Sequence, residues 1–190
     1  MRGAAVAIDL KRGSQVSDIK SYSGKFLLVF AALLVSMLAA CSSDSQSSAT
    51  AAAADAMAMD LYKSPTCGCC AIWQEHAQER GFAFTIHHLD NDELTREKLR
   101  RGINLRYHSC HTAVAADGSV FEGHIPAYLV RQYMANKPAD SIGLAVPGMP
   151  IGSPGMEVGE RLDPYDVLLL KSDGSAEVYA RVDDFQSQYQ

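Results

Sequence analysis

Three cysteines occupy four positions in the segment Ser64-Pro65-Thr66-Cys67-Gly68-Cys69-Cys70, and a helical pattern follows directly from Ala71 to Arg80. A free cysteine fills a core about as well as other small apolar residues, so packing gives no reason for this clustering. At the start of a helix, the dipole and the free amides stabilise a thiolate, which can then attack a disulfide or bind a soft metal ion. The segment therefore predicts a chemical site.

A second group of candidate ligands, Cys110 and His111, stands directly before a predicted strand that starts at Thr112. The outer cysteines of the first segment, Cys67 and Cys70, resemble the C-x-x-C active site of thioredoxins. In that fold a cis-proline faces the C-x-x-C pair, and His111 stands at the corresponding position here. We therefore expect a thiol and an imidazole to face the cysteine cluster.

Four thiolates with one imidazole suit Zn(II), Cu(I) or an iron–sulfur cluster, because all three accept soft donors. Zinc usually draws on separated pairs of cysteines. Three cysteines crowded into four residues fit bridging thiolates shared among several Cu(I) ions better than one tetrahedral zinc ion. The spacing favours copper, with zinc and iron–sulfur clusters less favoured.

Further candidate ligands are His124, Met149 and Met156. The two methionines belong to a Pro-Gly-Met sequence that occurs twice between Pro147 and Met156, and thioethers favour Cu(I). The alternative for the methionines is that they fill gaps in the core. The alternative for His124 is a separate metal or a structural role. His76 lies about 10 Å along the helix axis from Cys69. We therefore expect His76 to have a packing role rather than to bind the same metal ion as Cys69.

Two other functions remain open. The Cys67 and Cys70 pair could act in a thiol–disulfide oxidoreductase, with Cys67 as the nucleophile and Cys70 as the resolving thiol. The four thiols could also form two structural disulfides without activity. That last interpretation is awkward, because the adjacent Cys69 and Cys70 would need different partners within one tight turn.

The N-terminal region predicts export. An apolar run over 26–40 follows Lys20 and Lys25, is too short for a comfortable transmembrane helix, and ends in Leu38-Ala39-Ala40-Cys41. This ending resembles a bacterial lipobox, which implies a lipoprotein-type signal peptide over 1–40 and a diacylated Cys41. The alternative is a plain signal peptide cleaved near Ala40.

The remainder of the chain reads as a flexible tether over 41–56 and a folded domain over 57–190. Without residues 1–40, the chain keeps 12 basic and 20 acidic side chains, a balance that argues against a nucleic-acid partner. We expect the protein in the periplasm, lipid-anchored, and Ser42 after the cysteine favours the outer membrane. Unprotected thiols tend to oxidise there, so the cysteines must be disulfides, a redox pair or metal ligands.

The predicted elements alternate in the order β-α-β-α-β-β-α, which is the order of a thioredoxin-like α/β fold. A Gly/Pro/Met loop over 143–160 and an extra C-terminal β-hairpin around Ser172-Asp173-Gly174 follow. The predicted core strands and helices span 57–62, 70–80, 82–86, 92–101, 112–116, 119–124 and 126–136, and the hairpin strands span 165–170 and 176–182.

Four motifs together resemble one family of exported, predicted metal-binding proteins of unknown function, which includes CopG-type copper-resistance proteins. They are Tyr62–Cys70, Ser109–Ala113, Glu122–Pro126 and Gly143–Met156. The resemblance implies a thioredoxin-like domain that binds copper in the periplasm, with Cys67, Cys69, Cys70 and Cys110 as ligands. The expected partners are copper ions, the membrane through Cys41, and other periplasmic copper proteins.

Overall fold

The computed structural model describes residues 56–190. The predictions made for the signal peptide over 1–40, for lipidation of Cys41 and for nearly all of the tether over 41–56 lie outside the described residues. Between residues 56 and 190, no helix combines the length and the apolar character needed to cross a membrane.

In this part of the chain the elements follow the predicted order β-α-β-α-β-β-α and end in the predicted hairpin, which confirms the α/β class. The core comprises β1 (Met57–Lys63), α3 (Gly68–Gln78), β2 (Phe82–His88), α4 (Asn91–Arg100), η1 (Leu105–Tyr107), β3 (His111–Ala115), β4 (Val120–Glu122) and α5 (Ala127–Ala135). It is followed by β5 (Ser141–Ala145), β6 (Tyr165–Lys171), β7 (Ala176–Val182) and η2 (Gln186–Tyr189).

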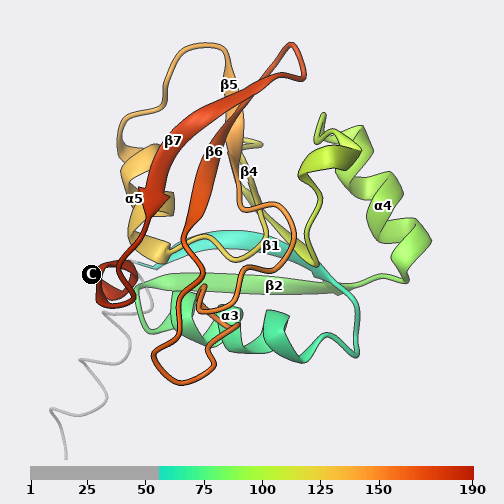
Figure 1. The fold of residues 1–190 in the computed structure, drawn as a ribbon. Helices are drawn as coiled ribbons and strands as arrows, with labels where there is room; N and C mark the ends of the chain where they lie inside the picture. Colours follow the sequence, from blue (N-terminus) through green and yellow to red (C-terminus); the bar gives the residue numbers. More distant parts are fainter. Residues whose placement is uncertain (1–55) are drawn as a thin grey trace, which may run out of the picture. The chain divides into compact units, whose positions relative to one another are not determined.

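All the strands belong to one mixed sheet of order β2-β1-β3-β4-β5-β6-β7 (Figure 1). The pairs β1–β2 and β4–β5 are parallel, and the other neighbours are antiparallel. Strand β5 corrects the prediction of a loop that begins at residue 143. Its Gly143 lies so close to β4 that an added Cβ would be 1.8 Å from the Val120 carbonyl oxygen. The hairpin β6–β7 therefore extends the sheet through β5.

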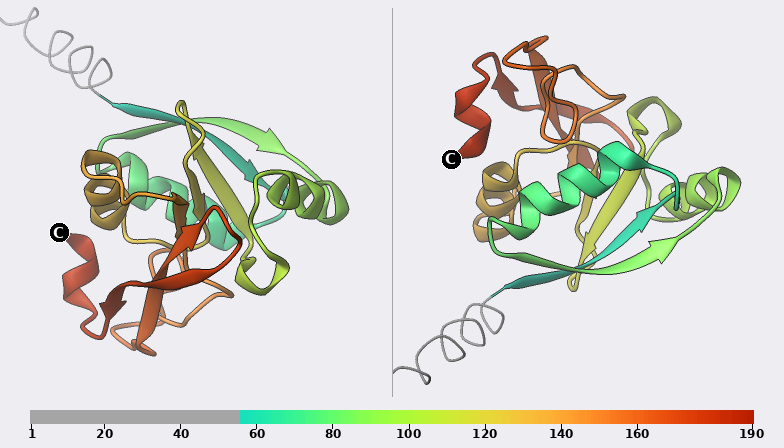
Figure 2. Two further views of the ribbon diagram at one scale, coloured as in Figure 1. Left: turned by 90° about the horizontal axis from the view of Figure 1, so that it is seen from above. Right: turned by 90° about the horizontal axis from the view of Figure 1, so that it is seen from below.

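The sheet separates two apolar clusters. Helices α3 and α5 cover one face, where Trp73, Phe121 and Tyr133 are fully buried. Ile103 packs on the other face with Val114 and Val120. Seen from below, α3 runs across the sheet (Figure 2). Successive residues of β3 and β4 thus point to opposite faces, and both faces are covered, which explains why every residue of these two strands is buried.

The start of α3 places the cysteines. The helix begins at Gly68, two residues before the predicted start, so Cys67 is its N-cap and the other two cysteines lie in its first turn. Cys67 makes no side-chain capping hydrogen bond. In contrast, α4 begins with a complete capping box between Asp90 and Glu93. The helix that carries the cysteines therefore keeps its first amides free of side-chain caps.

Candidate metal centre

The helix side of the centre is the turn over 64–70. The Cys67 amide donates a hydrogen bond to the Ser64 carbonyl at 3.2 Å, which closes the turn before α3. Cys67 and Cys70 form a disulfide in the structure, with their Cα atoms 5.4 Å apart. Cys69 is a free thiol and is half-buried. This side holds both an oxidised pair and a third sulfur.

The strand side approaches this turn because β1 and β3 pair in antiparallel fashion. Their register sets Lys63, the last residue of β1, opposite His111, the first residue of β3. Cys110 therefore lies beside the turn that follows β1. The Cys69 and Cys110 Sγ atoms are 3.9 Å apart, and the Cys70 Sγ lies 3.7 Å from the Cys110 carbonyl oxygen.

All four sulfur atoms of Cys67, Cys69, Cys70 and Cys110 lie within 4.8 Å of one another. The juxtaposition expected from the sequence is thus present in the fold. Thiolates can bridge two metal ions, and sulfurs this close together could share several Cu(I) ions after reduction of the disulfide. The ligand role of each cysteine stays a prediction.

Two imidazoles adjoin Cys110 and form a second compact group with it. The His124 Nε2 atom is 3.0 Å from the Cys110 Sγ, and the His111 Nδ1 atom is 3.4 Å from it. The other His124 nitrogen, Nδ1, lies 2.8 Å from the Pro154 carbonyl oxygen. Because a carbonyl only accepts, Nδ1 carries the proton and the lone pair of Nε2 faces the sulfur. His124 is therefore oriented as a ligand would be.

His111, unlike His124, has a ring nitrogen without a hydrogen-bond partner. Its ring packs 4.4 Å from the Trp73 ring, centroid to centroid, and its Nε2 atom is buried without a hydrogen-bond partner. An unpaired buried nitrogen is costly, so its retention needs a reason. Ligation of a metal through Nδ1 would be one such reason.

The electrostatic environment keeps these groups neutral in the absence of metal. Burial, with the neighbouring Cys69 second, raises the pKa of the Cys110 thiol to about 12. Burial lowers the pKa of His111 well below its usual value and also lowers the pKa of His124. A neutral imidazole keeps the lone pair that binds a metal, whereas the Cys110 thiol must lose its proton to bind one.

The Pro-Gly-Met loop reaches the centre. An added Cβ at Gly155 would lie 2.7 Å from the Cys69 carbonyl oxygen, so the loop backbone touches the start of α3. Met156 follows that contact and is half-buried, whereas the side chain of Met149 is 51% exposed. Figure 1 shows this orange segment between β5 and β6 passing close to α3. Both methionines stay predicted ligands.

His76 has the packing role expected from its position. It is buried, and its Nε2 atom accepts a hydrogen bond from the Ala127 amide at 3.2 Å. Burial, reinforced by Arg80, lowers its pKa to about 4. The neutral ring thus links α3 to the start of α5.

Lys98 and Glu122 form a buried ion pair next to the strand side of the candidate centre, and the sequence did not predict either residue as part of the site. A signal was present: Glu122 is an acidic residue that directly follows Val120 and Phe121 in the run over 119–124 that the pattern predicts as a strand. A charged residue in such a run needs a partner when it is buried. Nothing in the local pattern identifies Lys98 as that partner.

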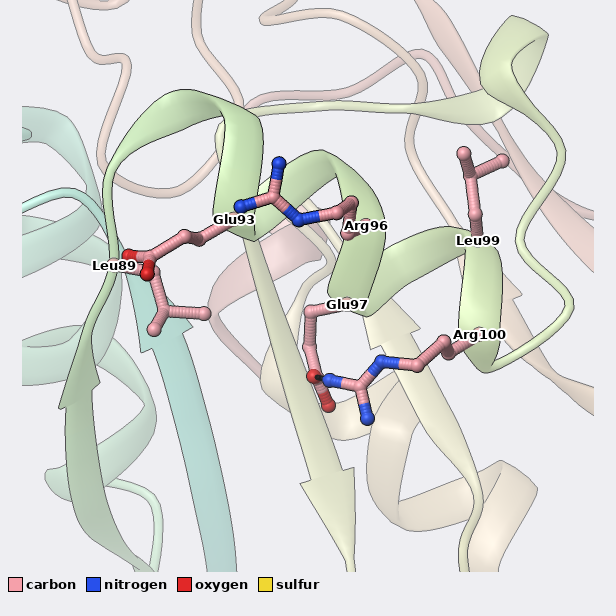
Figure 3. A pocket seen from close by; sticks show the side chains of 6 residues that line it. All are labelled: Leu89, Glu93, Arg96, Glu97, Leu99 and Arg100. Atoms are coloured by element: carbon pink, nitrogen blue, oxygen red, sulfur yellow. Dashed lines mark ion pairs between the residues drawn. The ribbon is translucent and has the colours of Figure 1, made fainter.

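The centre opens into a hollow of about 390 Å³. Its walls include Cys67, Cys110 and Lys98, together with hydroxyl groups from Ser64 and Thr66. A second hollow of about 520 Å³ lies along α4 (Figure 3). It is lined by Leu89, Glu93, Arg96, Glu97, Leu99 and Arg100, a set without cysteine or histidine, so soft-metal chemistry belongs to the first hollow.

Comparisons with known proteins identify relatives of this chain. The family "Protein of unknown function, DUF411" matches residues 107–156, which include Cys110, His111 and His124. Two solved structures, titled "Copper resistance protein copG- Form 1" and "Form 2", share 41% and 42% sequence identity with TM-scores of 0.62 and 0.61. Each match covers 67% of this chain and 98% of the other. No curated protein matches the sequence.

Proposed function

This chain belongs to the family of the copper resistance protein CopG, and from that premise we propose that it binds Cu(I) through Cys67, Cys69, Cys70 and Cys110. The observation that supports this proposal most strongly is the convergence of the four sulfur atoms within 4.8 Å of one another. Thiolates are the donors that Cu(I) prefers, and bridging sulfurs allow a multinuclear site. Binding would serve copper resistance or copper handling.

The imidazoles and the loop extend the proposed site. His124 presents an unprotonated nitrogen toward Cys110, and the His111 Nδ1 atom lies 3.4 Å from the same sulfur. Met149 and Met156 would add thioethers from the loop that contacts α3. Zinc or an iron–sulfur cluster would also accept these donors but would make less use of the crowded thiols.

The disulfide gives the proposed site two states. A dithiol reductant would convert the Cys67–Cys70 disulfide to two thiols and become a disulfide itself, which transfers two electrons. The reduced protein would then offer four thiols to Cu(I). In the oxidised protein only Cys69 and Cys110 of these four cysteines would remain as thiol donors, so oxidation would release copper or redistribute it.

The proposed location is the periplasm, where the lipidated Cys41 would anchor the domain, in the outer membrane. The support for this location is the apolar run over 26–40 and the lipobox-like ending Leu38-Ala39-Ala40-Cys41. In that compartment the protein would receive copper ions from, or deliver them to, other copper proteins.

The test is metal analysis of the full chain, loaded with Cu(I) and purified without oxygen after reduction. We expect more than one copper per chain and a near-UV thiolate-to-copper absorption band. Cys69→Ser should reduce the copper content sharply, whereas Ser64→Ala, in the same turn without a sulfur, should leave it unchanged. A reduced wild-type protein that remains free of copper would refute the proposal.

The second candidate function is thiol–disulfide exchange, and the Cys67–Cys70 disulfide favours it. Metal-free protein should then catalyse the reduction of insulin disulfides by an added dithiol, which becomes a disulfide as it regenerates the Cys67 and Cys70 thiols, and Cys67→Ser should abolish the catalysis. Loss of turnover on addition of Cu(I) would indicate that the same sulfurs serve both functions.

A further inference from the structure

Lys98 on α4 and Glu122 at the end of β4 form an ion pair that is almost completely shielded from water. Their side chains are 2% and 0% exposed, and Lys98 Nζ lies 2.5 Å from Glu122 Oε1. Transfer of two charges out of water is expensive, and replacement of such a pair by apolar residues often leaves a protein equally or more stable. Stability alone therefore does not explain the pair.

The pair holds the peptide units around Cys110 on both sides. Lys98 Nζ donates a hydrogen bond to the Ser109 carbonyl at 2.7 Å, and the Ser109 amide donates to Glu122 Oε1 at 2.6 Å. The Thr112 hydroxyl donates to the other oxygen, Oε2. One buried carboxylate thus ties down the residues that precede and follow Cys110 and His111.

The residue after Glu122, Gly123, also holds the end of β4 close to the segment that carries Cys110. Gly123 stands between Glu122 and His124, has a φ of +79°, and would place an added Cβ 2.6 Å from the Ser109 Cβ. Its amide donates to the His111 carbonyl at 3.0 Å. The end of β4 is therefore locked against the segment that carries Cys110.

Lys98 brings a positive charge to the wall of the hollow that Cys67 and Cys110 also line. Its ammonium group is already paired with Glu122, so the two side chains together add little net charge to the site. The pair therefore acts on the site through its hydrogen bonds to the segment that carries Cys110.

We propose that Lys98 and Glu122 are positioning residues of the copper site, which hold Cys110 in place and so set the affinity for Cu(I). The inference rests on the proposed function. Neither residue is a ligand in this scheme, because both oxygens of Glu122 accept hydrogen bonds from protein donors. Their role resembles that of the hydrogen-bonding groups that orient metal ligands elsewhere.

The test compares Cu(I) affinity, by anaerobic competition with a chromophoric Cu(I) chelator, between the full wild-type chain and two variants. Glu122→Gln keeps the size and an acceptor but leaves Lys98 without its counter-charge. The double variant Lys98→Met with Glu122→Gln removes both charges together, so it leaves no unpaired charge to disturb folding. Loss of supporting hydrogen bonds should weaken affinity about 10–100-fold. Copper X-ray absorption should report fewer sulfur neighbours per copper.

The matched control is Arg101→Met, which removes an ion pair with Glu97 on the same helix at 2.7 Å but touches no proposed ligand. Its affinity should stay within about twofold of the wild type. Circular dichroism establishes whether each variant is folded. If Glu122→Gln does not fold, the affinity of the double variant decides the test. A folded double variant with wild-type affinity and sulfur coordination would overturn the inference. A wild-type chain that binds no Cu(I) would overturn the proposed function itself.

Discussion

The two sides of the candidate metal centre are built in different ways. On the helix side, Cys67 and Cys69 are half-buried and α3 has no side-chain cap. On the strand side, over 109–112 and 122–124, most residues are buried and hydrogen bonds tie the backbone to Glu122. The helix side combines a disulfide with a free thiol, whereas the strand side holds its thiol and imidazoles against a hydrogen-bonded backbone. A site for a soft metal with changing occupancy would use both properties.

The strongest test of this contrast replaces one glycine on each side. Gly123→Ala should destabilise the reduced, metal-free protein by about 4 kcal/mol, because strain at positive φ and overpacking each contribute up to about 3 kcal/mol. The new Cβ would lie 2.5 Å from the Val146 carbonyl oxygen. Gly68→Ala, with nothing within 4 Å of the new Cβ, should change stability by less than about 0.5 kcal/mol.

Urea unfolding of both variants measures these differences. Equal effects at the two positions would show that the strand side is no more rigid than the helix side, and the contrast would then fail.

Acid should distinguish the buried histidines of the two sides. Burial, reinforced by Arg80, lowers the pKa of His76 to about 4 in the folded protein, whereas the ordinary pKa of histidine is 6.5, so the unfolded state takes up the proton first. Stability is therefore complete above pH 6.5 and falls between pH 6.5 and pH 4, by about 3 kcal/mol for this one group. His76→Gln should remove that share of the acid dependence.

The comparison uses the slope of unfolding free energy against pH, from denaturant titrations of metal-free protein. The pH dependence of stability that remains in His76→Gln should come from His111 and His124 on the strand side, because burial lowers the pKa of both. An unchanged slope in His76→Gln would contradict the assignment of a neutral, buried His76.

The smallest predicted effect concerns the uncapped helix. Cys67→Ser should stabilise the reduced, metal-free protein by about 0.5–1 kcal/mol, because a serine hydroxyl at the N-cap accepts a hydrogen bond from a free amide of the first turn. The same change should lower copper binding. The matched variant is Asp90→Ala, which removes the existing cap of α4 and should cost about 1 kcal/mol.

Thermal unfolding under reducing conditions measures both changes. A Cys67→Ser variant that is less stable than the wild type would show that Cys67 also stabilises the fold on the helix side.

The sequence located most of the elements, because helix and turn signals are local. Gly81 and Gly102 follow α3 and α4 with positive φ, as their positions after the helices predict. The missed strand, Ser141–Ala145, has no alternating pattern and contains a glycine. Its strand form depends on hydrogen bonds from β4 and β6, which lie elsewhere in the chain. The name thioredoxin-like stays a prediction.

The site was predicted in part for a similar reason. The crowding of Cys67, Cys69 and Cys70 is visible in the chain, and Cys110 could be placed opposite them through the expected fold. The ion pair of Lys98 with Glu122 could not be predicted, because each residue alone resembles an ordinary charged side chain. The contact between the two side chains exists only in the folded protein, where both are buried against Ser109.

The sequence by itself determined which candidate donors the chain offers, that three thiols stand at the start of a helix, and the order of most of the elements, since these follow from composition and from neighbours along the chain. The tertiary structure decided which sulfurs face Cys110, which nitrogen of His124 is free, and which charges surround them. Those features depend on contacts between residues that the pairing of β1 with β3, and of β3 with β4, brings together. Strand pairing is a long-range interaction, and a local pattern does not encode its partner.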